Sequence, residues 1–434
     1  MAQPRATAGS AHPRAPFYPE IPKSVEDTGL SMGFLTDLAI KIMYFEGNLS
    51  GIELSERLAL PYSGVVNQVL EFLKREKFIE VKGSSGFAEA AYQYAIADKG
   101  RGMAREALDR SSYAGYAPVP LTSYTDAIKQ QPIGQVEVHQ RTMRQALSHL
   151  VIDETTFSRL GPAVNSGRSI FLFGPPGNGK TAIAEAVGNM LLGNNMYIPY
   201  AVEVGGQVIK IFDYVNHEAA KDASTVDPRL VDPRWIRIRR PVIITGGELT
   251  LETLDLVYDE TNKYYEAPFQ MKSNGGMLLI DDFGRQHVRP RDLLNRWIVP
   301  LEKRVDYLTL HTGRKIEVPF DVLIVFSTNL EPKDLVDEAF LRRIRHKIEV
   351  TNPTYEEFRE IFRRICTSRN IPYDDRGLAY LLQEHYVARK REMRSCHPRD
   401  IVDQLTDIAR YLNVQPVLSK DLIDRACEAY FVEL

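Results

Sequence analysis

The chain has 434 residues, of which 44% are hydrophobic and 26% charged, and its formal net charge is −3. This balance is typical of a soluble globular protein with two or three domains, and it supplies no general attraction to nucleic acid. No apolar run approaches the length of a membrane span, the first residues contain no apolar signal segment, and the three cysteines form no CxxC pair. We therefore expect a cytoplasmic protein without a membrane span, a disulfide framework or a zinc site.

The N-terminal part of the sequence divides into a tail and a small α+β domain. Residues 1–30 are rich in Pro, Ala and Gly, which predicts a disordered tail. Residues 31–112 alternate between helical and strand patterns and predict a winged-helix domain with a two-stranded wing. The expected helices are Ser31–Phe45, Gly51–Leu58, Ser63–Lys77 and Gly102–Ser111, and the expected strands are Phe78–Lys82 and Tyr92–Ala97.

Winged-helix domains commonly lay their third helix in the major groove of DNA. Here that helix is rich in apolar residues, and residues 31–110 contain 10 basic and 11 acidic side chains. Neutralisation of phosphates supplies most non-specific DNA affinity. This charge balance therefore favours a protein-docking or structural role, and DNA binding stays an alternative.

Residues 113–135 predict a linker, and residues 136–350 predict an α/β core that opens with a helix over Gln135–Val151. An insertion lies within residues 196–274 of this core. Its segment Trp235–Pro241 alternates arginines with apolar residues. This pattern predicts a strand with a charged face, which is either solvated or in contact with nucleic acid or a partner.

The most informative segment is a glycine-rich loop, preceded by the apolar run Ser169–Phe173 and followed by a helical pattern. The loop residues are Gly174, Pro175, Pro176, Gly177, Asn178, Gly179, Lys180 and Thr181. In this setting the backbone N–H groups and the positive end of the helix surround a polyphosphate. Lys180 reaches the β- and γ-phosphates, and the Thr181 hydroxyl coordinates Mg²⁺. The sequence therefore predicts an ATP–Mg²⁺ site in an α/β P-loop fold.

Two later apolar strands end in polar residues. Gly276–Ile280 leads into Asp281 and Asp282, and Val322–Phe326 leads to Asn329. The carboxyl ends of neighbouring parallel strands are where a P-loop enzyme holds its metal and its attacking water. We expect Asp281 to hold Mg²⁺, Asp282 to polarise the water and Asn329 to hold that water in place.

Arginines gather at two places beyond these strands. Arg342, Arg343 and Arg345 follow one another closely, and Arg399 lies at the start of a late helix. A guanidinium stabilises the charge that develops on a γ-phosphoryl group in transfer, although either group could be ordinary surface charge. Four helices are expected in residues 351–434, namely Thr354–Arg369, Gly377–Lys390, Pro398–Leu412 and Ser419–Tyr430.

From about residue 136 to the C-terminus, this order of motifs resembles the AAA+ ATPases. In that family the motifs are called Walker A, Walker B, sensor 1, arginine finger and sensor 2, and they match Gly174–Thr181, Asp281 with Asp282, Asn329, Arg343 and Arg399. The resemblance implies a helical lid over residues 351–434 and a site completed by a neighbouring subunit's finger. It also implies a homo-oligomeric ring, commonly a hexamer. Arg343 is the better finger candidate because it directly precedes the apolar Ile344, and Arg342 is the alternative.

A narrower resemblance is to the AAA+ branch that includes MoxR-type chaperones and σ54 activators. Members of that branch carry a β-hairpin just before sensor 1. Here Val305–Leu310 and Ile316–Phe320 are strand-like, and the residues His311–Arg314 between them suit a turn. The resemblance implies that ATP hydrolysis moves this hairpin together with the winged helix.

The Walker B motif departs from the family pattern. AAA+ ATPases normally end it with Asp-Glu, whereas this chain has Asp281 followed by Asp282. The shorter carboxylate lies further from the water that it must orient, and small displacements of catalytic groups are costly. We therefore expect slow hydrolysis of ATP, coupled to remodelling of a protein client in the manner of a MoxR-like chaperone. The alternative is an ATP-controlled DNA-binding regulator that uses the winged helix.

Overall fold

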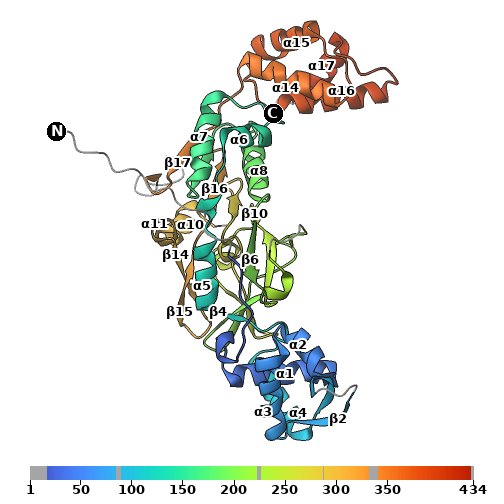
Figure 1. Cartoon of the computed structure of the whole chain (residues 1–434). Helices are drawn as coiled ribbons and strands as arrows, with labels where there is room; N and C mark the ends of the chain where they lie inside the picture. Colours follow the sequence, from blue (N-terminus) through green and yellow to red (C-terminus); the bar gives the residue numbers. More distant parts are fainter. Residues whose placement is uncertain (1–16, 85–88, 222–225, 287, 332–340, 432–434) are drawn as a thin grey trace, which may run out of the picture. The chain divides into compact units, whose positions relative to one another are not determined.

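The computed structural model describes residues 17–84, 89–221, 226–286, 288–331 and 341–431, and the chain divides into two compact units (Figure 1). The first unit falls within Met1–Gln131, Met196–Gly206 and Lys221–Arg237. The second unit falls within Pro132–Asn195, Gln207–Ala220 and Ile238–Leu434. The described residues contain no helix with the length and apolar composition that a membrane span requires.

The N-terminal part of the first unit packs helices around a three-stranded antiparallel sheet in the order β1-β3-β2. The elements are α1 (Met32–Glu46), β1 (Leu49–Ser50), α2 (Gly51–Leu58), α3 (Asn67–Arg75), β2 (Ile79–Ser84), β3 (Tyr92–Ile96) and α4 (Asp98–Arg110). One expected helix, Ser63–Lys77, is shorter than expected and becomes regular at Asn67. Gly64 has a φ of 84°, and a Cβ there would lie 2.1 Å from the carbonyl oxygen of Lys23. This close approach interrupts the helix and requires glycine.

Two segments that we expected to be unstructured carry structure in the first unit. Of the tail, residues 17–30 include the short helix Glu26–Thr28, whereas residues 1–16 lie outside the described residues. The expected linker 113–135 contains β4 (Val119–Pro120) and α5 (Leu121–Gln130). The tail and linker predictions did not include these elements, because composition alone does not register the tertiary contacts that order a chain.

Some of those contacts come from a buried ion pair in the insertion. Arg234 and Asp232 are 4% and 1% exposed, and their closest atoms lie 2.8 Å apart. Arg234 Nη1 also donates to the carbonyl oxygens of Thr28 (3.0 Å) and Pro118 (3.4 Å). A buried guanidinium needs such partners, and here they join the insertion to both segments. Part of the insertion thus belongs to the first unit, which corrects the expected core boundary of 136–350.

Three further strands of the first unit come from the insertion. They are β6 (Asn195–Pro199), β7 (Ala201–Val204) and β9 (Trp235–Arg239). β7 pairs in parallel with β4, and β6 pairs with β9. The strand expected from the alternating arginines is present as β9. Trp235 and Ile238 are buried, and the remaining side chains of this strand are half-buried.

The second unit is built on a parallel sheet in the order β10-β13-β16-β5-β17. Its strands are β5 (Ile170–Phe173), β10 (Val242–Thr245), β13 (Met277–Ile280), β16 (Leu323–Thr328) and β17 (His346–Glu349). Alternate side chains enter two separate apolar clusters. Leu172 and Leu279 belong to one cluster, and Phe171 and Leu278 belong to the other. The sheet is therefore covered on both faces, which confirms the α/β P-loop fold.

One layer of helices consists of α6 (Gln140–Ala146), α7 (Glu154–Asn165) and α8 (Lys180–Leu191), and the other side carries α10 (Pro290–Arg296) and α11 (Ile298–Lys303). The expected helix Gln135–Val151 is wrong in extent. Only α6 forms, and Arg364 instead binds the carbonyl oxygens of Ser148 (2.7 Å) and Leu150 (3.3 Å). A new helix, α7, then starts at the cap residue Asp153, which accepts a hydrogen bond from the Thr156 N–H.

The predicted β-hairpin is present directly before β16. It consists of the antiparallel strands β14 (Val305–Thr309) and β15 (Lys315–Pro319). Asp306 of β14 is fully buried and binds Arg296 at 2.5 Å and Gln270 at 3.0 Å, which fixes the hairpin base. The remaining elements of this region are β8 (Gln207–Lys210), β11 (Val257–Asp259), β12 (Tyr264–Glu266) and α9 (Phe269–Lys272).

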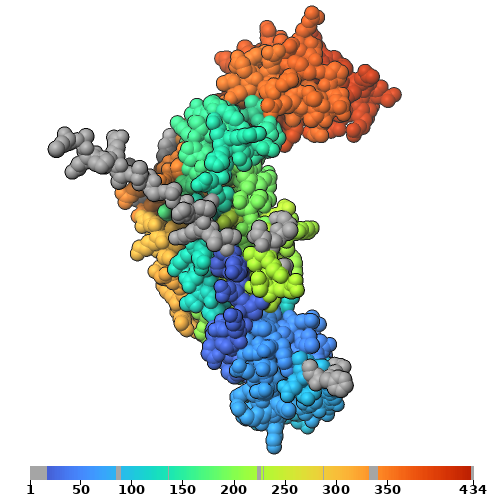
Figure 2. Space-filling view, viewed as in Figure 1, coloured from blue at the N-terminus to red at the C-terminus, as the bar shows by residue number. Residues whose placement is uncertain are grey.

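The C-terminal helices form a body with an apolar core of its own, coloured orange to red in Figure 2. They are α14 (Tyr355–Ser368), α15 (Asp375–Leu381), the π-helical turn Leu382–Val387, α16 (His397–Tyr411) and α17 (Lys420–Tyr430). Each expected helix of this region is present. Thr354 begins the first of them with a reciprocal capping box to Glu357.

The start of β13 offers a test of this packing. A Cβ on Gly276 would lie 2.0 Å from the Pro241 carbonyl oxygen, so Gly276→Ala must displace the entry to β10. We expect a loss of about 1–3 kcal/mol in the free energy of unfolding, measured by urea denaturation. Gly134→Ala is the control, because a Cβ at that position would have no neighbouring atom within 4 Å. Equal stability of the two variants would contradict the tight approach of β10 and β13.

Candidate nucleotide site

The glycine-rich loop connects β5 to α8 and depends on backbone conformations that glycine favours. Gly174, Gly177 and Gly179 have φ values of 136°, 81° and 82°. A Cβ on Gly174 would lie 2.3 Å from the carbonyl oxygen of Val350. Because α8 begins at Lys180, its first N–H groups have no partner within the helix and face the loop. The loop therefore has the geometry and the local positive potential that bind phosphate.

Lys180 is held inside the site by three oxygen atoms. Its Nζ donates to the carbonyl oxygens of Gly174 (3.0 Å) and Pro175 (2.9 Å) and to Asn329 Oδ1 (2.8 Å). Burial lowers the pKa of Lys180, and the charges of Asp281 and Asp282 oppose that shift. A buried ammonium beside carboxylates is ready to exchange these neutral acceptors for phosphate oxygens.

The predicted carboxylates and amide lie at the same edge of the sheet. Thr181 Oγ1 donates to Asp281 Oδ2 at 2.8 Å, and Asn329 Nδ2 donates to Asp282 Oδ1 at 3.4 Å. The Asp282 N–H also binds Asp281 Oδ1 at 3.0 Å. A hydroxyl and a carboxylate in contact are the hard oxygen donors that Mg²⁺ accepts. The described residues contain no group of three or more His, Cys, Asp or Glu that could hold a metal.

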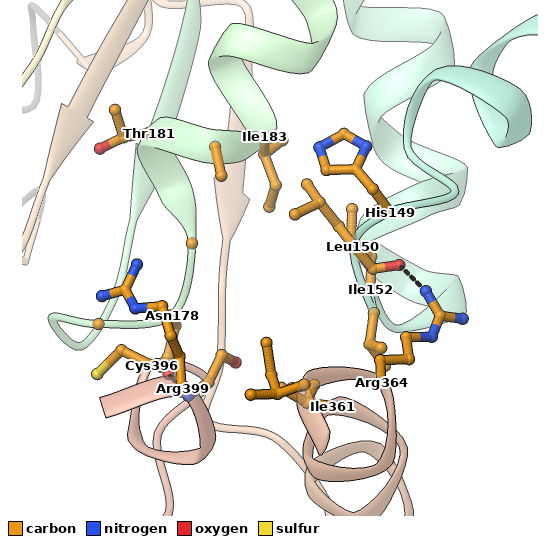
Figure 3. Close-up of a pocket in the computed structure, with 16 residues that line it drawn as sticks. His149, Leu150, Ile152, Asn178, Thr181, Ile183, Ile361, Arg364, Cys396 and Arg399 are labelled. Carbon is orange, nitrogen blue, oxygen red and sulfur yellow. Dashed lines mark hydrogen bonds between the residues drawn. The ribbon is translucent and has the colours of Figure 1, made fainter. Parts of the chain in front are cut away.

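Beside the loop lies a pocket of about 410 Å³, drawn in Figure 3. Its walls are mainly apolar. They include Leu150, Ile152, Ile183 and Ile361, with His149 at one side (Figure 3). The dashed line in Figure 3 is the bond from Arg364 to the Leu150 carbonyl, which joins α14 to the pocket wall. Sequence reasoning missed these residues, because isolated isoleucines and leucines carry no signal that distinguishes a pocket wall from a core.

The predicted arginines have different surroundings. Arg399 lies at the start of α16 and lines the pocket, where its Nε donates to Asp400 at 2.9 Å. Arg343 Nε donates to Glu302 of α11 at 2.5 Å, and the Arg343 side chain is 20% exposed. Arg342 beside it is exposed. Within the described chain, Arg399 is thus part of the pocket, and the pair of Arg343 with Glu302 does not belong to it.

Comparisons with known proteins show similarity to a family model and to several ATPases. Residues 354–429 match a family described as a domain of unknown function, DUF8689. The chain is 26% identical to the proteasome-activating nucleotidase of Archaeoglobus fulgidus over 281 residues, which span 60% of this chain and 68% of that protein. It is 24% identical to the 26S proteasome regulatory subunit 6B homolog of Dictyostelium discoideum, over 70% of this chain and 59% of that protein. These similarities support the resemblance of the chain to AAA+ ATPases.

Solved structures share less sequence identity with this chain than these relatives do. The RuvB Holliday junction branch migration motor of Thermotoga maritima aligns over 68% of this chain and 71% of its own length. The TM-score is 0.36 and the sequence identity 15%, so this likeness supports no argument about the site.

The second carboxylate of the Walker B-like motif lies in an uncommon backbone conformation. Asp282 is exposed and has a φ of 47°, in the left-handed region. Asp and Asn enter that region more readily than longer side chains because their short polar groups bind the local backbone. The conformation at position 282 therefore favours Asp over the Glu of the usual family motif.

The contact between the loop and the lid can be measured with two glycines of almost equal φ. Both Gly177→Ala and Gly179→Ala should lose about 1–2 kcal/mol from left-handed strain. A Cβ on Gly177 would also lie 2.5 Å from Cys396 Sγ, whereas nothing lies within 4 Å at Gly179. We expect Gly177→Ala to lose about 1–3 kcal/mol more in urea denaturation without nucleotide.

The control for this comparison is a double-mutant cycle. Adding Cys396→Ala should remove most of the additional loss in the Gly177→Ala protein, because the clashing sulfur is gone. An additional loss that persists without the sulfur would mean that the loop does not contact the lid at this point.

Proposed function

We propose that this AAA+ ATPase binds ATP with Mg²⁺ at the glycine-rich loop and hydrolyses it at interfaces between copies of the chain in a ring. The observation that carries the proposal is one run of contacts, from Thr181 through Asp281 and Asp282 to Asn329 and Lys180. This run joins three strand ends that lie up to 149 positions apart in the sequence. A core held together only by packing would not require these polar groups at one edge.

The base and the phosphates of ATP would occupy different parts of the site. The apolar pocket beside the loop suits a flat aromatic base, with Ile183 on one wall and Ile361 on another (Figure 3). The backbone N–H groups of residues 177–180 would bind the phosphates, and Lys180 would exchange its contact with Asn329 for a phosphate oxygen. This exchange would leave the Asn329 amide free to orient the attacking water.

The chain's own residues would then carry the hydrolytic step. Thr181 and Asp281 would hold Mg²⁺, which when bound neutralises charge on the phosphates. Asp282 would accept a hydrogen bond from the attacking water and take up its proton. Asn329 would hold this carboxylate in place by donating a hydrogen bond to it. Arg399 of the same chain and Arg343 of a neighbouring copy would stabilise the charge on the transferred group. For the second role Arg343 would have to leave Glu302 or act together with it, and the exposed Arg342 stays the alternative.

A protein client is the substrate class that we propose. The relatives named above are a proteasome-activating nucleotidase and a proteasome regulatory subunit homologue, and the β-hairpin before β16 supports the MoxR-like branch. The second candidate is an ATP-controlled DNA-binding regulator, favoured by the winged-helix arrangement that we propose for α1–α3 with β2 and β3. The near balance of 10 basic and 11 acidic side chains in residues 31–110 argues against it.

Two substitutions separate ATP binding from hydrolysis. Lys180→Ala removes the cation that faces the β- and γ-phosphates, so ATP affinity should fall about tenfold to a hundredfold. Asp282→Asn keeps the size of the side chain and the left-handed backbone, so ATP affinity should stay within about twofold while hydrolysis falls about a hundredfold or more. Binding of a fluorescent ATP analogue and release of phosphate measure the two quantities. Unchanged hydrolysis in the Asp282→Asn protein would assign the role to another group.

The ring is tested by mixing variants. Arg343→Ala should bind ATP normally and hydrolyse it about a thousandfold more slowly, because an arginine finger acts on the neighbour's phosphate. Mixed with Lys180→Ala subunits, which have an intact Arg343 and no working site, the Arg343→Ala subunits should regain activity. Arg399→Ala should show no such rescue, since Arg399 serves its own pocket. If Arg342→Ala is rescued by mixing and Arg343→Ala is not, Arg342 is the finger.

A further inference from the structure

One residue of the glycine-rich loop is bonded to the lid instead of the loop itself. Asn178 is 5% exposed, and both polar atoms of its side chain have partners. Its Nδ2 donates to Asn352 Oδ1 at 2.8 Å, and its Oδ1 accepts the Ser395 N–H at 3.1 Å. The neighbouring Gly177 carbonyl accepts the Cys396 N–H at 2.8 Å. We call these three hydrogen bonds the clasp.

The partners in the clasp lie at two separate points of the chain. Asn352 lies between the last strand of the sheet, β17, and the first helix of the lid, α14, so it belongs to the connection between core and lid. Ser395 and Cys396 directly precede α16, the helix that begins at His397 and carries Arg399. The clasp therefore joins the loop both to this connection and to the helix that brings an arginine to the pocket.

The clasp is extended by one more polar contact. Asn352 Nδ2 donates to Glu392 Oε2 at 3.1 Å, so the orientation of the Asn352 amide is fixed by a carboxylate on one side and by Asn178 on the other. A buried amide that loses its partners pays the full cost of desolvation. Partial opening is for this reason unfavourable, and the clasp is expected to be either closed or open.

We propose that Asn178 is a positioning residue that couples the nucleotide state of the loop to the position of the lid and of Arg399. The phosphate ligands in such a loop are its backbone N–H groups, so any adjustment of residues 177–180 to a polyphosphate moves the Gly177 carbonyl and the Asn178 side chain with it. Both groups are bonded to the lid. Loss or addition of the γ-phosphate thereby changes the lid through the clasp. This inference rests on the proposed binding of ATP.

The test removes one hydrogen bond of the clasp by a substitution outside the loop, so that the sequence of the loop is unchanged. Asn352→Ala removes the acceptor of Asn178 Nδ2. We expect ATP affinity to stay within about twofold and kcat to fall about tenfold, since displacement of Arg399 costs rate and not binding. Hydrogen–deuterium exchange of the Ser395 and Cys396 amides in nucleotide-free protein should become about tenfold faster, because these N–H groups lose their protection.

A double substitution that moves the carboxylate from position 392 to position 352 should rescue the clasp. Asn352→Asp alone places a carboxylate against Glu392 and should resemble Asn352→Ala. Combined with Glu392→Gln, it allows both hydrogen bonds again. The side chain at position 352 still accepts from Asn178, and the bond between positions 352 and 392 forms with donor and acceptor exchanged, so kcat and amide protection should return. Tyr380→Phe is the control, because it removes a lid hydrogen bond to Asp424 (3.0 Å) outside the clasp and should change neither quantity.

The outcomes separate this inference from the proposed function. If the wild-type protein hydrolyses ATP and Asn352→Ala keeps its kcat, or if the exchange of Ser395 and Cys396 is unaltered, the coupling role is wrong. If the variants at position 352 lose affinity, kcat and unfolding temperature together, and Glu392→Gln rescues none of them, the contact is merely structural. That result would also overturn the coupling role. If the wild-type protein neither binds nor hydrolyses ATP, the proposed function itself fails, and the coupling fails with it even where the exchange data show the clasp.

Discussion

Parallel pairing of β13, β16 and β5 is the constraint on which the rest of the site depends. The register sets Ile280 beside Phe326 and Thr328 beside Phe173, so the three strands end at one edge of the sheet. Parallel strands need long crossover connections, and residues distant in sequence are thereby brought to adjacent strand ends. The two apolar faces hold this register, because a shift of one residue would exchange the clusters that contain Phe171 and Leu172.

The strand edge explains why a lysine can stay buried before any phosphate arrives. Lys180 donates hydrogen bonds to two carbonyl oxygens of its own loop and to the amide oxygen of Asn329, and two carboxylates lie nearby. A buried cation without such partners would lose its charge or destabilise the fold. The same contacts hold the loop in one conformation, so less order has to be created when a ligand enters.

The lid is both an independent body and a wall of the site. Its apolar core is separate from the clusters of the sheet, yet Arg364 of α14 orders the segment 148–152, and the clasp joins α16 to the loop. A rigid body attached by a few directional hydrogen bonds can take discrete positions, as the coupling of nucleotide state to movement requires. Directional hydrogen bonds also connect separate segments in the first unit, where Arg234 of the insertion donates to the backbone carbonyls of Thr28 and Pro118.

The sequence by itself determined the elements whose signal is local. The glycines of residues 174–179 are required by their own φ values, the carboxylates and Asn329 follow directly from buried strands, and the lid helices show helical periodicity. Tertiary structure alone decided the rest. Thr28 and Pro118, the latter just before α5, are bonded to a guanidinium that lies more than 100 positions away, and the pocket wall and the clasp combine residues from separate elements. Such contacts leave no periodic trace in the sequence, because burial and hydrogen bonding between distant segments depend on where the whole chain brings them.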